Sequence, residues 1–205
     1  MTPRFVLYLL LLLTVFVIGM VRYKNRTAPF KALTLFVGVT FISELMTRVV
    51  TYKLGYSSPV YHVYIIAMYL FYAWMYRQLC SSHAIRKAIL ISVPVFIGLA
   101  VMNTLYYQSL KRFPSNMLQI ACVLIVVLSL IIYRQMFHYP IEENLFRQPV
   151  FWLNTGTLFF YTTTFLLLSF LNYFVSQKLN IVPLRDMLYI SGIIYYVILG
   201  IALLV

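Results

Sequence analysis

The chain is poor in charged residues, and poorest in acidic ones. Charged residues make up only 10% of the 205 residues, and just four of them are acidic, whereas about 25% of a soluble domain is charged. Hydrophobic residues make up 63%. Such a chain has too few polar side chains to cover a soluble domain, so the composition excludes the soluble globular class.

Several kinds of chemistry lack the residues they need. Cys80 and Cys122 are the only cysteines and predict neither a disulfide framework nor a metal site. No lysine lies in the middle of an apolar run, which argues against a retinal Schiff base, and His62 is the only histidine near one, which argues against a membrane haem. Paired carboxylates, an activated serine and a glycine-rich phosphate loop are also missing. We therefore lean against an enzyme and predict no cofactor and no bound metal.

What the chain has in abundance is long apolar runs. Seven of them come close to the roughly 20 residues that cross a bilayer. They predict an all-α polytopic membrane protein, a single seven-transmembrane-helix bundle over residues 1–205, with spans at about 5–21, 30–51, 60–78, 88–107, 117–137, 150–175 and 187–205. The connections are too short to hold a soluble domain, and no internal repeat points to an inverted-repeat transporter.

The basic residues give the orientation. The net charge of +12 comes from 16 Lys and Arg that lie mostly in the short connections, as topology signals do, and we therefore predict no nucleic-acid partner. Nine lie on one side of the predicted membrane and seven on the other. Since the richer side faces the cytoplasm, we predict an integral protein of a bacterial cytoplasmic (inner) membrane, with its N-terminus outside and its C-terminus inside.

Glu44 is the most informative residue, because it is the only acidic residue inside a predicted span; Glu142 and Glu143 fall in a connection. A charge in hydrocarbon costs roughly 2.5–3.5 kcal/mol on insertion scales, so such residues face a bundle interior, pair with each other or line a site. Arg48 follows one helical turn later, the favourable i, i+4 spacing. A purely structural Glu44–Arg48 clamp is the rival interpretation.

Other polar side chains fall at the same membrane depth as Glu44. Because successive spans run in opposite directions, the far end of one span lies beside the near end of the next. With the orientation above, this depth is the outer half of the membrane. The predicted ligand-binding residues are Glu44, Arg48, His62, Tyr61, Tyr69, Tyr72, Asn103, Gln119, Asn172 and Tyr189. Tyrosines near span ends also serve as interface anchors, and buried amides also bond neighbouring helices, so each has a structural alternative.

The stretch Pro149-Val150-Phe151-Trp152-Leu153-Asn154, with Tyr161 beyond it, adds a resemblance. Together with the Glu44 helix and the tyrosine-rich third span, it resembles a group of uncharacterised seven-helix integral membrane proteins of Bacteroidota. Proteins of that kind occur beside, or fused to, sensor histidine kinases. The resemblance covers nearly the whole chain in layout and implies a sensor or accessory module whose signal leaves through the last span. It transfers no catalytic residue.

Three functions remain open at this stage. The first is a sensory or ligand-binding module, with the lipid bilayer around it, a small amphiphile, lipid or quinone-like molecule as ligand, and a cytoplasmic signalling protein at its C-terminal side. The second is a small-solute or proton-coupled transporter or channel that uses Glu44. The third is a structural subunit of a larger membrane complex. The sequence gives neither the ligand nor the oligomeric state.

Overall fold

The chain folds entirely into helices and their connections, as predicted. The computed structural model describes residues 3–138 and 144–205, so the Glu142 and Glu143 pair lies outside the described residues. Within them there are seven long helices: α1 (Pro3–Val21), α2 (Ala28–Leu54), α3 (Ser58–Leu79), α4 (His83–Met102), α5 (Ser115–His138), α6 (Pro149–Ser176) and α7 (Val182–Leu204). Short 3₁₀ turns at Tyr23–Asn25 (η1) and Leu145–Arg147 (η3) precede α2 and α6, and a π-helical turn, η2 (Asn103–Tyr107), extends α4.

Six of the seven helices are long and apolar enough to cross a membrane, which makes the chain an integral membrane protein with multiple spans. The exception is α3, whose 22 residues include five tyrosines and His62. These side chains lower its mean hydropathy, although a helix of that length rises about 33 Å, enough to cross a hydrocarbon core of about 30 Å. A seventh span at α3 therefore stays a prediction. Helices α4 and α7 begin earlier than their apolar runs, because their first five residues include Arg86, Lys87, Arg185 and Asp186.

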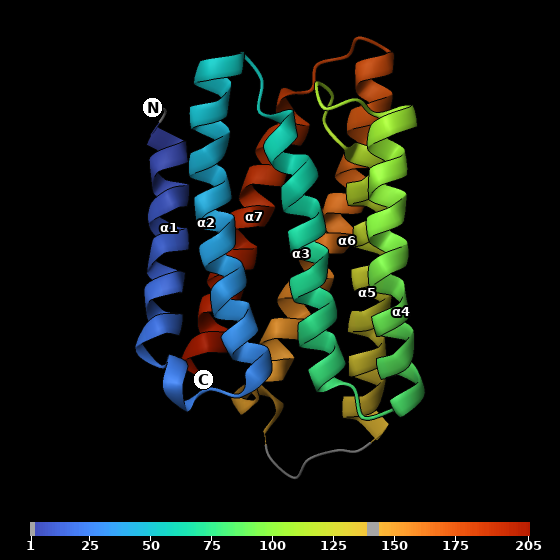
Figure 1. Cartoon of the computed structure of the whole chain (residues 1–205). Helices are drawn as coiled ribbons and strands as arrows, with labels where there is room; N and C mark the ends of the chain where they lie inside the picture. The colour runs from blue at the N-terminus through green and yellow to red at the C-terminus, as the bar shows by residue number, and fades with distance from the viewer. Residues whose placement is uncertain (1–2, 139–143) are drawn as a thin grey trace. The chain divides into compact units, whose positions relative to one another are not determined.

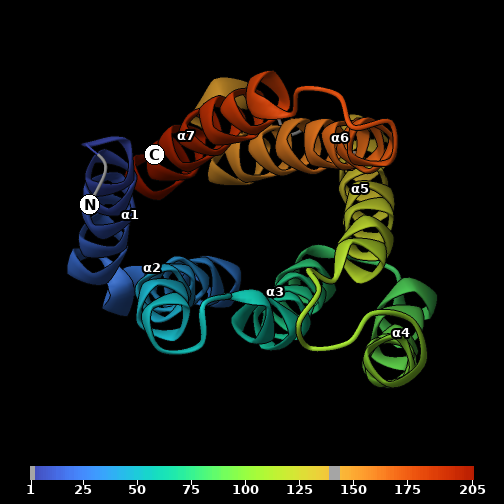
Figure 2. The ribbon, with the colours of Figure 1, turned by 90° about the horizontal axis from the view of Figure 1, so that it is seen from above.

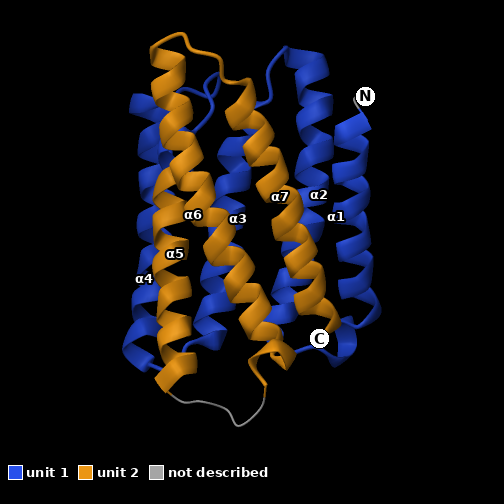
Figure 3. Cartoon of the chain, turned by 180° about the vertical axis from the view of Figure 1, so that it is seen from behind, with its two compact units in different colours: residues 1–118 blue, residues 119–205 orange. Residues whose placement is uncertain are grey.

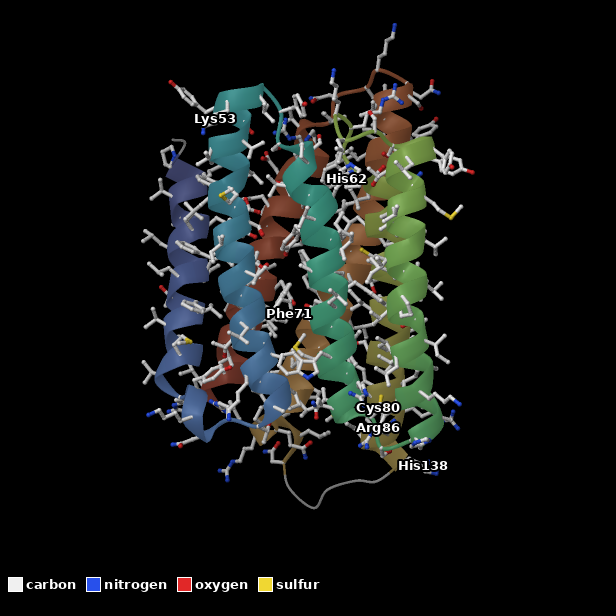
Figure 4. All side chains as sticks on the ribbon, viewed as in Figure 1. Lys53, His62, Phe71, Cys80, Arg86 and His138 are labelled. Atoms are coloured by element: carbon white, nitrogen blue, oxygen red, sulfur yellow. The ribbon has the colours of Figure 1, made fainter. Side chains whose placement is uncertain are left out.

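The described chain divides into two compact units, Met1–Leu118 and Gln119–Val205, drawn in different colours in Figure 3. In unit 1 the first four helices follow one another as neighbours and alternate in direction (Figures 1 and 2). The C-terminus of α2 and the N-terminus of α3 therefore lie at one end of unit 1, marked by Lys53 and His62 in Figure 4, which we call the Lys53 end. The α3–α4 connection lies at the opposite end, marked by Cys80 and Arg86, which we call the Arg86 end.

Helices α1 and α2 are packed closely enough to require glycine. A Cβ atom on Gly19 of α1 would lie 2.5 Å from the Thr34 hydroxyl oxygen and 3.0 Å from its Cβ on α2. Helices in lipid associate through such close van der Waals contact, because the apolar effect that drives packing in water is absent between lipid-facing surfaces. This contact fixes α1 against α2 and sets the position of the residues that follow Thr34 along α2.

In unit 2 the tightest contact is between α6 and α7. A Cβ on Gly156 would lie 2.8 Å from Cγ2 of Ile198 and 3.3 Å from its Cβ. One turn along the same interface, the Phe160 and Tyr195 rings stack with centroids 4.5 Å apart and planes 11° apart. A small residue beside a stacked aromatic pair lets the two helix backbones approach while the rings fill the neighbouring space.

Candidate functional site

The predicted acid–base pair lies where α2 meets α3 at the Lys53 end. Glu44 and Arg48 are in the second half of α2, one turn apart, and their charges act on each other. Both charges also act on the Tyr61 hydroxyl of α3, which lies within reach of the Thr47 hydroxyl. The structure thus brings Glu44, Arg48 and Tyr61 together from two helices. Glu44 is half-buried, and Arg48 is exposed.

Arg48 has an aromatic partner on a third helix. Its guanidinium carbon lies 3.9 Å from the centroid of the Phe5 ring of α1, well within the range of a cation–π contact. Among residues 3–138 and 144–205, no ion pair joins the Glu44 carboxylate to a cation within salt-bridge distance. The guanidinium is therefore positioned by a ring, while the carboxylate keeps hydrogen-bonding capacity that no described side chain uses.

His62 is engaged by the α4–α5 connection. Its Nε2 lies 3.1 Å from the Arg112 carbonyl oxygen, and its Nδ1 lies 2.9 Å from the Thr104 hydroxyl. A carbonyl only accepts, so Nε2 carries the proton and donates it. Ser58, one turn earlier on α3, donates to the Lys111 carbonyl at 3.2 Å. Both nitrogens of His62 are thus used to hold the connection against the start of α3.

Asn103 belongs to the same end but to an amide network of its own. It opens the π-helical turn and donates through Nδ2 to the Gln108 Oε1 at 3.1 Å. Gln108 in turn donates to the Ser115 hydroxyl at 3.0 Å and accepts from the Asn116 backbone N–H at 3.2 Å. These bonds hold the connection from α4 to α5 in place, so the polar groups of Asn103 stabilise the fold there.

The two predicted tyrosines in the middle of α3 pack against different helices. Tyr69 stacks on Phe96 of α4 with centroids 4.2 Å apart, and its hydroxyl lies 2.7 Å from the Ser92 hydroxyl. Tyr72 instead meets Phe36 of α2 edge-on, with centroids 5.2 Å apart. Both rings are fully buried, and Tyr69 lies about 12 Å along the helix from Tyr61. They form an aromatic interior of unit 1 that begins two turns beyond the acid–base pair.

The remaining predicted residues lie in unit 2. Gln119 of α5 donates through Nε2 to the Ser169 hydroxyl of α6 at 3.0 Å. Asn172 is exposed near the end of α6, and Tyr189 of α7 is half-buried. Each unit is described by itself, so the meeting of these three residues with those of unit 1 stays a prediction.

The pair of polar residues whose hydrogen bonds are most completely satisfied by each other was not predicted from the sequence. The Ser129 hydroxyl of α5 donates to Oδ1 of Asn154 on α6 at 2.7 Å, and Nδ2 of Asn154 donates back to the Ser129 carbonyl at 2.9 Å. Both residues are almost completely buried. A polar residue inside each of two successive apolar runs, Ser129 near the middle of one and Asn154 near the start of the next, was the available signal. One turn further along α5, the Tyr133 hydroxyl bonds that of Thr155, the residue after Asn154 on α6.

The arrangement places a charged, half-open cluster in unit 1 and a closed neutral pair in unit 2. Within the described residues, no three His, Cys, Asp or Glu side chains gather in a way that suits a metal ion. The structure shows a polytopic helical membrane protein with a buried aromatic and polar cluster. No protein-family model, curated protein or solved structure matches the chain.

Proposed function

We propose that this membrane protein is a ligand-binding, sensory module whose site is centred on Glu44, Arg48 and Tyr61. The observation that carries the proposal is the Glu44 carboxylate, which lies within a membrane-spanning helix without an ion pair among the described residues. A charge in hydrocarbon is costly, roughly 2.5–3.5 kcal/mol even on lenient scales. A ligand that donates hydrogen bonds to Glu44 offsets that cost, whereas a lone structural carboxylate does not.

The neighbouring side chains favour an amphiphilic ligand. Glu44 accepts hydrogen bonds, Arg48 donates them, and both flank the Tyr61 hydroxyl. Aromatic rings surround these groups: Phe5 lies against Arg48, and Phe113 packs edge-on against Tyr61 with centroids 5.1 Å apart. A small amphiphile, lipid or quinone-like molecule matches this set, with its polar group at Glu44 and Arg48 and its ring or chain toward Tyr69 and Tyr72.

Signalling would follow from the place of the site between helices. The acid and the base are on α2 and the tyrosine is on α3, so a ligand that touches all three favours one arrangement of these helices over others. The resemblance to proteins found beside histidine kinases supports a cytoplasmic signalling partner at the C-terminal side. The outward-facing position of the site rests on the predicted orientation.

A structural role is the second candidate, and one observation favours it. The cation–π contact of Arg48 with Phe5 joins α2 to α1 without any ligand. If Glu44 serves mainly to orient Arg48 for that contact, the cluster is a clamp within unit 1 or toward another subunit. A transporter using Glu44 as its coupling carboxylate is a third candidate, which flux in proteoliposomes would distinguish.

Native mass spectrometry of the protein released from nanodiscs tests the proposal. We expect the wild type to retain a discrete small molecule and Glu44→Gln to lose it. Asp186→Asn is the matched control, because it makes the same change from carboxylate to amide near the start of α7. It should retain the molecule. A bare protein mass in all three samples contradicts the ligand-binding proposal and favours the clamp.

A further inference from the structure

The Arg86 end of unit 1 carries a dense positive charge that the proposed ligand site does not use. Two connections meet there, between α1 and α2 and between α3 and α4, because neighbouring helices alternate in direction (Figure 1). Neither connection contains an acidic residue. We call the cations of these connections and of the adjoining helix ends the basic surface: Arg22, Lys24, Arg26, Lys31, Arg77, Arg86 and Lys87.

Local structure positions several of these cations. The 3₁₀ turn η1 brings Arg22 near Arg26, and partial burial together with the Arg22 charge lowers the pKa of Arg26 from its usual value. The Lys31 ammonium lies 5.8 Å from the Tyr23 ring centroid. In the other connection, Arg86 donates through Nε to the Cys80 carbonyl at 2.6 Å (both labelled in Figure 4). The charges of Arg22 and Arg26 lie close enough to act on each other.

The depth of the basic surface matches that of lipid phosphates. Helix α1 has 19 residues and rises about 28 Å, nearly the thickness of the hydrocarbon core. The last two residues of α1, Met20 and Val21, are 47% and 81% exposed apolar side chains. Arg22 and Lys24 follow directly and are exposed. Acyl chains at Val21 therefore place a headgroup beside Arg22 and Lys24.

We propose that the basic surface binds the headgroups of anionic phospholipids, with Arg22 and Lys24 contacting the phosphate. A zwitterionic headgroup also has a phosphate, but its ammonium finds no carboxylate in either connection. Attraction to anionic lipid is worth about a fivefold change in affinity for each Lys or Arg near the surface, from about 1 kcal/mol per charge. The surface therefore selects lipids by net charge.

Native mass spectrometry with added lipid tests this inference. Phosphatidylglycerol and phosphatidylcholine with identical acyl chains are titrated onto wild type, Arg22→Gln/Lys24→Gln and the control Lys178→Gln/Arg185→Gln, which removes one charge from the α6–α7 connection and one from the first turn of α7. We expect the wild type to prefer phosphatidylglycerol, the first variant to bind it roughly 30-fold more weakly, and the control to keep the preference. Binding of phosphatidylcholine should not change.

Three results would overturn the inference. No preference in the wild type would mean that the surface serves another partner, such as an acidic protein. An equal loss of phosphatidylglycerol affinity in the control would mean that only the net charge of the protein matters. Displacement of the lipid by millimolar inorganic phosphate would identify a site for free anions. If the first variant fails to fold, Lys24→Gln/Lys87→Gln replaces it, because both lysines are exposed and one lies in the α1–α2 connection and the other near the start of α4.

Discussion

Two helix contacts place polar groups within membrane-spanning helices, and they do so in opposite ways. At the α5–α6 contact, Ser129 and Asn154 are neutral, almost completely buried and bonded to each other in both directions. At the α2–α3 contact, Glu44 and Arg48 are ionisable and more accessible, and the described partner of Arg48 is the Phe5 ring. The first contact uses its hydrogen-bonding capacity internally, and the second leaves part of it unused.

The difference separates stabilising polar groups from functional ones. Reciprocal bonds between buried neutral groups stabilise a helix pair, by an average of about 0.6 and at most about 1.7 kcal/mol per bond. A charged group without an internal partner contributes little stability, and the cost of its burial has to be offset by something else. Variants at the α5–α6 contact should therefore lose mainly stability, and variants at Glu44 and Arg48 should lose mainly ligand binding.

The largest loss of stability is expected from Asn154→Ala. The change removes both bonds to Ser129 and leaves a cavity between α5 and α6, for a combined loss of about 3 kcal/mol in the free energy of unfolding. Reversible unfolding in mixed micelles measures it. Asn172→Ala is the matched control on the same helix, because Asn172 is exposed, and it should change the value by less than about 0.5 kcal/mol. Equal losses would remove the distinction between the two contacts.

Gly156→Ala should follow, with a loss of about 2 kcal/mol. The new methyl group would lie 2.8 Å from Cγ2 of Ile198, which sits at a branched carbon and cannot swing aside. Gly98→Ala in α4 is the control, since its Cβ would meet nothing within 4 Å. It should be neutral or stabilising by up to about 1 kcal/mol, because alanine favours the helix. The same unfolding assay compares the two, and a neutral Gly156→Ala would mean that α6 and α7 can separate.

The sequence predicted the helices better than it predicted their partners. All seven helices and the all-α membrane class follow from apolar runs, because a span must satisfy its backbone internally and needs about 20 residues. Glu44, Arg48 and Tyr61 were placed at one depth and are brought together. Spacing alone did not show that Tyr69 turns toward α4 and Tyr72 toward α2. A face of a helix is wide enough to contact two neighbours, and only the packing decides between them.

His62→Phe should cost about 1 kcal/mol, less than the changes in unit 2. Phenylalanine keeps a planar ring but loses the bonds to the Arg112 carbonyl and the Thr104 hydroxyl. Each bond contributes a net of about 0.5–1.5 kcal/mol after exchange with water, and the more apolar ring offsets part of the loss. The α4–α5 connection should then exchange amide hydrogens faster, which hydrogen exchange with mass spectrometry detects. His83→Phe, at an exposed position, should leave exchange unchanged. Unchanged exchange in both would mean that the amide network of Asn103 and Gln108 holds the connection alone.

Glu44→Gln should change the free energy of unfolding least, by less than about 0.5 kcal/mol, although it alters the group in the span whose burial in hydrocarbon costs most. Glutamine keeps the shape of the side chain, and Arg48 keeps its contact with Phe5. A double-mutant cycle with Arg48→Gln measures the coupling between the two residues. We expect it to stay within the 0.2–0.5 kcal/mol or so of an ordinary i, i+4 pair. A coupling above about 2 kcal/mol would make the pair a clamp like Ser129 and Asn154. A small coupling combined with loss of a bound molecule would leave ligand binding as the reason for a carboxylate at this depth.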